Sequence, residues 1–155
     1  MKPEAERPGP EGDPLKELER ACAPRQRIDR LHARRVMLAI GERVLAEDAV
    51  GAGELAGRVR QITSSRAVDW ESAVRDEILM AATEHVRSVD PRFLRRPDYD
   101  LDYTVAARAE LEARLRAADL LGIEVPAHLL ERVSAADRLL APLLGPGRPQ
   151  DGSAS

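Results

Sequence analysis

The sequence lacks the residues on which several classes of protein depend. It has one cysteine, Cys22, among 155 residues, which excludes an internal disulfide framework and a zinc site built from cysteine pairs. Aromatic residues make up only 3%, so a core must be built mainly from Ala, Leu, Val and Ile. The longest apolar runs, 36–40 and 78–82, are far shorter than the about 20 apolar residues of a membrane-spanning helix. We therefore expect no membrane partner.

An excess of positive charge is also missing. The chain has 24 basic and 27 acidic residues and a formal net charge of −3, which argues against a surface built as a whole to bind phosphate backbones. A local basic patch is still compatible with this balance. Because Lys2 and Lys16 are the only lysines, the abundance of arginine and alanine most simply reflects GC-rich coding, and arginine counts are not evidence of function.

The two ends differ in composition from the segment between them. Prolines, glycines and charged residues fill 1–13 and 145–155, a composition typical of disordered tails. Residues 14–144 are expected to form a single helical domain. The start of the sequence does not combine a basic segment with the apolar stretch of a secretory signal. We therefore expect a reducing, cytoplasmic location.

Apolar residues in the central segment recur at the spacing of α-helices. The pattern predicts an all-α bundle of about five to six helices, and no segment alternates at period two for long enough to require a strand. Helices are expected from Pro14 and over about 25–47, 55–62, 69–89, 103–121 and 126–144. The glycine-rich segment 51–57 is expected to be a flexible junction between helices rather than a phosphate-binding loop, because no strand precedes it.

The last two predicted helices differ in the surface they present. Glu110 with Arg114, and Glu112 with Arg116, are spaced for ion pairs along an exposed face. The final helix has the most regular apolar stripe in the chain, which consists of Leu129, Val133, Ala136, Leu140 and Leu143. A small bundle need not cover every such stripe, so this one is a candidate surface for a protein partner or for self-association.

Residues 90–103 are the most unusual segment of the chain. They contain three of the four aromatic residues, together with three arginines. Arginine and tyrosine supply much of the contact area and hydrogen bonding of protein interfaces, so the segment predicts a partner-binding surface consisting of Arg92, Phe93, Arg95, Arg96, Tyr99 and Tyr103. The alternative is structural: Asp100 or Asp102 caps the next helix, and the aromatic residues hold the loop against the bundle.

Two features favour nucleic acid instead. Arg27, Arg30 and Arg34 would form a basic stripe on one predicted helix, suited to phosphates or to an acidic partner. Residues 116–123, RAADLLGI, resemble the helix and turn of bacterial helix-turn-helix DNA-binding regulators, and the resemblance implies DNA binding. It ends after Ile123, because Glu124 and Glu131 stand where the recognition helix of that family presents groups to DNA.

No arrangement of residues typical of catalysis, of a metal site or of a cofactor site is recognisable. The histidines His32, His85 and His128 fall on three predicted helices, and at most one of them, His32 with Asp29, forms a pair of the type that a di-metal bundle needs twice. His85 is expected to be partly buried with a backbone partner. The sequence therefore favours a non-catalytic interaction, regulatory or assembly subunit over an enzyme, with a nucleic-acid-binding regulator as the alternative.

Overall fold

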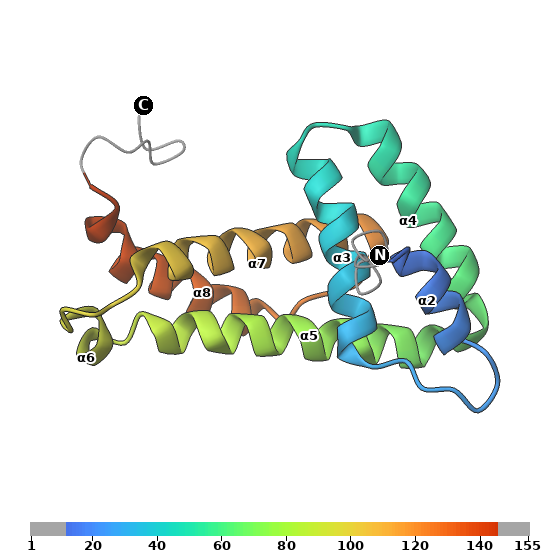
Figure 1. Ribbon diagram of the computed structural model, residues 1–155, viewed down its shortest axis with the longest axis horizontal. Helices are drawn as coiled ribbons and strands as arrows, with labels where there is room; N and C mark the ends of the chain where they lie inside the picture. Colours follow the sequence, from blue (N-terminus) through green and yellow to red (C-terminus); the bar gives the residue numbers. More distant parts are fainter. Residues whose placement is uncertain (1–11, 146–155) are drawn as a thin grey trace, which may run out of the picture.

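The structure is a computed structural model that describes residues 12–145 (Figure 1). Its helices of at least two turns are α2 (Pro14–Ala21), α3 (Arg30–Leu45), α4 (Ala49–Thr63), α5 (Ala67–Ser88), α7 (Leu101–Leu121) and α8 (Ala127–Leu140). The single turn α6 (Pro91–Leu94) and the 3₁₀ turns η2 (Ser64–Arg66) and η3 (Ala141–Leu144) complete the described elements. These residues contain no strand, so the prediction of an all-α bundle is confirmed. The tails expected over 1–13 and 145–155 fall almost entirely outside the described residues.

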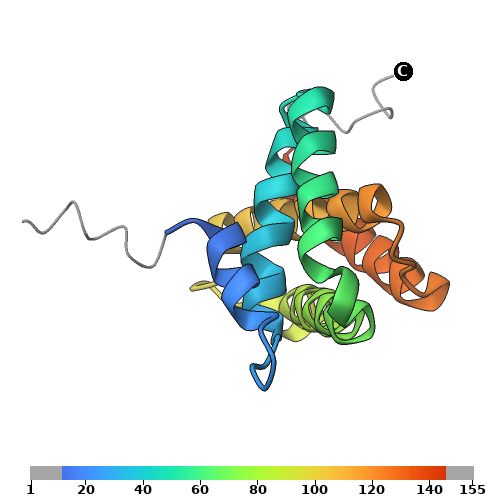
Figure 2. The same ribbon diagram turned by 90° about the vertical axis from the view of Figure 1, so that its right-hand side faces the viewer.

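The helices form an elongated arm and a group of shorter helices at one end of it. α5 and α7 run along the arm side by side, with α8 on one side of them (Figures 1 and 2). α3 crosses α5 and α7 on the opposite side from α8, and α2 and α4 pack against α3. Across the described residues, no helix has both the length and the apolar character to span a membrane.

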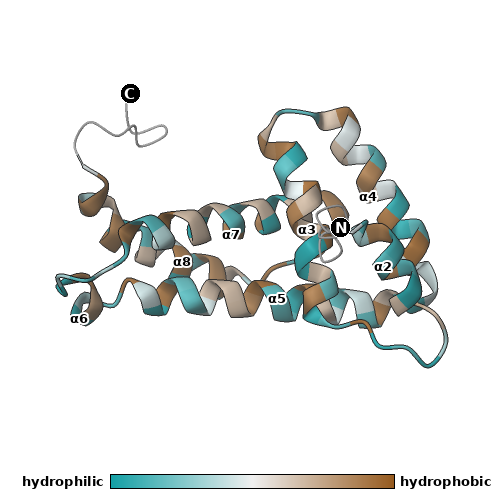
Figure 3. Cartoon of the chain, viewed as in Figure 1, coloured by the Kyte–Doolittle hydropathy of each residue, from teal (hydrophilic) through white to brown (hydrophobic). Residues whose placement is uncertain are grey.

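The core follows the apolar faces of these helices and has two parts (Figure 3). The larger part lies where α3 crosses the arm and includes the fully buried Met37, Ile40, Ile78 and Leu111. The smaller part lies where α6 and η3 meet the arm and is centred on Val89, Ala136 and Leu140. Alanines are frequent in the larger part, which lets helices that carry few aromatic residues approach each other closely.

The closest approach is between α3 and α7, the pair of helices with the most extensive contact. Gly41 faces Ala113 there, and a Cβ atom added to Gly41 would lie 2.0 Å from the carbonyl oxygen of Ala113. Only glycine fits at this crossing. Gly41 therefore fixes the distance between the arm and the helix that crosses it.

Several helix ends match the sequence prediction. α7 ends at Gly122, whose φ of 74° is left-handed, as expected for a glycine that terminates a helix. The Asp100 side chain accepts a hydrogen bond from the backbone of Tyr103 and caps α7, as the structural alternative for this segment proposed. The helices expected over 69–89 and 103–121 are confirmed within two residues at each end.

Two predicted boundaries are wrong. The helix expected from about residue 25 begins at Arg30, because Asp29 caps α3 through hydrogen bonds from the backbone of Leu31 and His32. The glycine-rich segment 51–57 is not a junction but lies within α4. The Asp48 side chain caps that helix by accepting a hydrogen bond from the backbone of Gly51.

The apolar stripe of α8 is inside the protein. Four of its members have exposures of 3% to 4% and pack against the arm, namely Leu129, Val133, Ala136 and Leu140. Only Leu143, which lies in η3, is exposed, at 40%. The stripe is therefore core, and the prediction that it serves as a surface for a partner or for self-association is wrong.

Candidate functional site

A groove of about 390 Å³ lies between α5 and α7 and ends against the first turns of α3. Its walls carry Met80 and Glu84 on α5 and Tyr103 and Glu110 on α7, and alanines lie between them. Met80 is 45% exposed and Tyr103 is 65% exposed. The groove therefore combines large exposed apolar surface with small side chains that leave room for an occupant.

A buried ion pair forms the end of the groove nearest α3. Glu77 on α5 and Arg114 on α7 have side-chain exposures of 4% and 5%, and Arg114 Nε lies 3.1 Å from Glu77 Oε2. This contact lacks hydrogen-bond alignment, so the Nε–H group has no acceptor among the described atoms. Arg30 of α3 donates a hydrogen bond of 3.2 Å to the other oxygen of Glu77. Burial lowers the pKa of Arg114, and the charge of Glu77 opposes that effect.

A second, more exposed pair continues this network toward solvent. Arg34 Nη2 lies 3.5 Å from Glu110 Oε1, and Arg114 Nη2 lies 3.6 Å from the same oxygen. The expectation that Glu110 and Arg114 mark an exposed outer face is therefore wrong for Arg114. Glu112 and Arg116 do pair along a more exposed face of α7, at 2.8 Å.

His85 lies toward the other end of the groove. Its side chain is 2% exposed, and Nε2 lies 2.8 Å from Oδ1 of Asp137 on α8. The predicted backbone partner is wrong, because this partner is a carboxylate on another helix. Nδ1 has no hydrogen-bond partner in the described part of the chain.

Asp137 joins α8 to both helices of the arm. Arg108 of α7 donates to its two oxygens at 2.9 and 3.0 Å, while His85 of α5 contacts it from the other side. Burial raises the pKa of Asp137, but the hydrogen bonds from His85 and Arg108 outweigh burial and lower that pKa to about 2. Asp137 is therefore a carboxylate at neutral pH, and it accepts a hydrogen bond from the Nε2–H group of His85.

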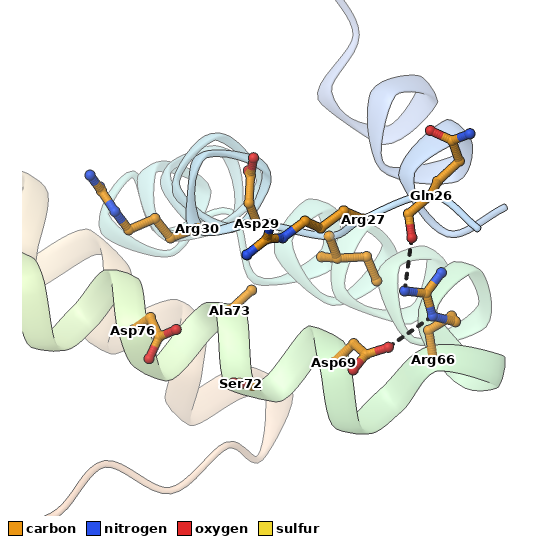
Figure 4. A pocket seen from close by; sticks show the side chains of 10 residues that line it. Gln26, Arg27, Asp29, Arg30, Arg66, Asp69, Ser72, Ala73 and Asp76 are labelled. Atoms are coloured by element: carbon orange, nitrogen blue, oxygen red, sulfur yellow. Dashed lines mark hydrogen bonds and ion pairs between the residues drawn. The ribbon is translucent and has the colours of Figure 1, made fainter. Parts of the chain in front are cut away.

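The predicted basic stripe does not exist as a stripe on one helix. Arg30 and Arg34 lie on α3 and pair with Glu77 and Glu110. Arg27 precedes α3 and lines a different hollow, of about 480 Å³, between the loop before α3 and the start of α5 (Figure 4).

The groups in that hollow hold the loop in place. Arg66 donates to the carbonyl oxygen of Gln26 at 3.2 Å and to Asp69 at 3.0 Å (Figure 4). It also donates to the carbonyl oxygen of Ala23 at 3.3 Å. Arg66 therefore holds the loop 23–26 against the start of α5. This hollow presents no unpaired buried side chain of the kind found in the groove.

The predicted partner-binding residues of 90–103 lie on α6, in the turn after it and at the start of α7. Tyr99 donates a hydrogen bond of 2.9 Å to Thr104, and the Arg96 guanidinium lies 6.0 Å from the centre of the Phe93 ring. Arg92 pairs with Asp90 at the start of α6, and Arg95 is exposed beside it. Only Tyr103, which lies on α7 rather than in the loop, lines the groove. The groove is thus lined by one residue of the predicted loop surface, Tyr103, and by two arginines of the predicted stripe, Arg30 and Arg34.

Sequence reasoning missed the charged residues that link the helices of the arm. Glu77, Arg108 and Asp137 were not singled out, and Arg114 was expected on an exposed face, because their ion pairs join helices that are far apart in the sequence. One signal was available: Arg114 lies three residues after the buried Leu111, so it shares the buried face of its helix.

The remaining motifs have structural explanations. The three histidines lie on α3, α5 and α8, and over residues 12–145 no group of three potential ligands could hold a metal ion. In the segment similar to helix-turn-helix regulators, Gly122 ends α7 and Ile123 is buried. α8 then runs back along the arm and buries its apolar face (Figure 1).

Comparison of the chain with protein-family models, with curated proteins and with solved structures finds no match.

Proposed function

We propose that the protein is a non-catalytic interaction subunit that binds a protein partner in the groove between α5 and α7. The observation that carries this proposal is the pair of large apolar side chains on its two walls. Met80 and Tyr103 stay 45% and 65% exposed and line the groove, whereas other exposed large apolar side chains, such as Leu79 at 50% and Val68 at 82%, do not line it. Aromatic and methionine side chains are enriched in protein interfaces because they supply large contact area.

The floor of the groove suits a helix or an extended segment. Ala81 and Ala107 also line the groove, and small residues allow the backbone of a partner to approach closely. The charged side chains at its rim, such as Glu84 and Glu110, supply the polar border that interfaces share. This arrangement matches the mode in which a partner helix inserts apolar side chains into a groove between two helices.

The polar groups near His85 support an interaction rather than a catalytic role. A nucleophile would need a hydroxyl group within hydrogen-bond distance of the free Nδ1. The hydroxyl of Ser88 instead donates to the backbone oxygen of His85, and that of Thr104 donates to the backbone of Asp100. Both hydroxyl groups therefore donate to nearby backbone oxygens and not to the Nδ1 atom of His85.

The charges of the groove favour protein over nucleic acid. Of the three arginines proposed for phosphate binding, Arg30 and Arg34 pair with carboxylates and Arg27 lies in a separate hollow. Phosphate binding releases counterions from the nucleic acid only where the protein supplies an excess of cations, and over its whole lining the groove balances three arginines with three carboxylates. A protein partner needs no such excess.

A photo-crosslinking amino acid placed at Met80 tests the proposal in the cells that produce the protein. We expect an adduct with another polypeptide chain from this position. The matched control replaces Val68, which lies at the start of the same helix, is 82% exposed and does not line the groove. The proposal is wrong if position 80 yields no polypeptide adduct, or if position 68 yields the same adduct in the same amount.

A further inference from the structure

The charges along the groove are distributed unequally. At the end near α3, three arginines (Arg30, Arg34 and Arg114) face two carboxylates (Glu77 and Glu110), which leaves one net positive charge. At the other end, Glu84 is the one charged side chain in the lining, and it is 67% exposed. Its nearest cation, Arg87, is 3.9 Å away and lies outside the groove. The groove is therefore positive at one end and negative at the other.

The apolar wall lies between these two ends. Glu77, Met80 and Glu84 follow each other along α5, so the positive and negative ends are separated by about 10 Å at 1.5 Å per residue. Met80 projects into the groove between them. When a second copy of such a groove faces the first in the reversed direction, the positive end of each copy meets the negative end of the other, and the apolar centres meet.

We infer that the partner in the groove is a second copy of this chain, bound about a two-fold axis that crosses the groove near Met80. A two-fold axis presents the same surface patch on both subunits and reverses its direction. The Arg34 end of each copy then meets the Glu84 end of the other, and the two Met80 side chains meet near the axis. The inference rests on the proposed function and names its partner.

The buried polar groups set the boundary of this interface. Glu77 and Arg114 are already paired beneath the groove, so they need not be desolvated again when a second copy binds. The new charge contacts would form between Arg34 and Glu84, which are 46% and 67% exposed. Such contacts at the edge of an interface act mainly on orientation and specificity.

The first test is the mass of the full chain measured by light scattering across a series of concentrations from micromolar to millimolar. We expect a transition from 17.0 kDa to twice that mass. Met80→Glu places two like charges near the axis and is expected to shift the transition beyond the series while the far-UV circular dichroism stays unchanged. A wild-type chain that remains a monomer at every concentration overturns the inference.

Reversal of the charges provides the sharper test. Arg34→Glu and Glu84→Arg each create two repulsive contacts in a symmetric dimer and are each expected to weaken it by about tenfold or more. An equimolar mixture of the two variants restores both contacts in the mixed dimer, so its mass should return to the wild-type curve. Glu54→Arg and Arg58→Glu, at exposed positions of α4, are the matched controls and should leave the dimer unchanged.

The outcomes separate this inference from the proposed function. A dimer that withstands both reversals, or that the mixture does not restore, places the interface elsewhere and overturns the inference. A monomer that still crosslinks from position 80 to a different protein also overturns it, but leaves the proposed function intact. The absence of any adduct from position 80 contradicts the proposed function itself.

Discussion

Replacing Gly41 with alanine tests the packing that positions the groove. The added Cβ atom would lie 2.0, 2.4 and 2.7 Å from the carbonyl oxygen, carbonyl carbon and Cα of Ala113. All three are backbone atoms of α7, so no side-chain rotation relieves the overlap. α3 and α7 must move apart, and they share the most extensive helix contact of the described chain.

The magnitude follows from two opposing effects. Alanine is intrinsically better than glycine in a helix by about 1 kcal/mol, whereas overpacking a close contact costs about 1–3 kcal/mol and occasionally more. Because this overlap is with rigid backbone, we expect the upper part of that range to apply. Gly41→Ala should therefore lower the free energy of unfolding by about 2 kcal/mol, which corresponds to a fall in Tm of about 4–8 °C for a chain of this size.

Gly53→Ala is the matched control. This glycine lies in α4, and a Cβ atom added there meets nothing within 4 Å. The substitution should stabilise the protein by about 0.5–1 kcal/mol through helix propensity and through lower entropy of the unfolded chain. Urea unfolding of the two variants, followed by circular dichroism, measures both effects. Equal stabilisation by the two substitutions would refute the close approach of α3 and α7.

Two further predictions concern the charged groups of the arm. Glu77→Ala leaves Arg114 buried without its buried partner and should destabilise the fold by about 3–5 kcal/mol in urea unfolding. Glu77→Leu combined with Arg114→Met should recover most of this loss. A double variant no better than the single one would contradict the account. Because the folded-state pKa of Asp137 is lowered to about 2 from 3.8, its contribution is fully present above pH 3.8 and is lost as the pH falls toward 2. That contribution is below about 2 kcal/mol, since the side chain is 37% exposed. Asp137→Asn should flatten the stability curve in this pH window, and an unchanged slope would show that other carboxylates dominate.

Local signals explain which parts of the fold could be predicted from the sequence. The end of α7 at Gly122 and the cap at Asp100 depend on residues within one turn of the helix terminus. The buried face of α8 follows from its own apolar spacing. The start of α3 also depends on a local feature, the capping side chain of Asp29. The predicted helix began too early because the apolar pattern continues on the N-terminal side of Asp29.

The groove could not be predicted because it depends on distant partners. Arg114 has an ordinary i,i+4 partner in Glu110, and only the position of Glu77 on another helix explains why it is buried. The pairing of His85 with Asp137 likewise joins two helices that are separated by α6 and α7. Tyr103 was grouped with the loop residues although it also began the helix expected over 103–121, and it lines the groove because α7 runs along α5.

The identity of the peptide crosslinked from position 80 is the most direct test of the central claim that the groove between α5 and α7 is an interaction surface. The experiment uses an equimolar mixture of isotopically heavy and light protein, each with the photo-crosslinking residue in place of Met80. The account predicts adducts that join heavy to light chains through peptides of α5 or α7. A chain that forms no polypeptide adduct at this position, in the mixture or in cells, would contradict it.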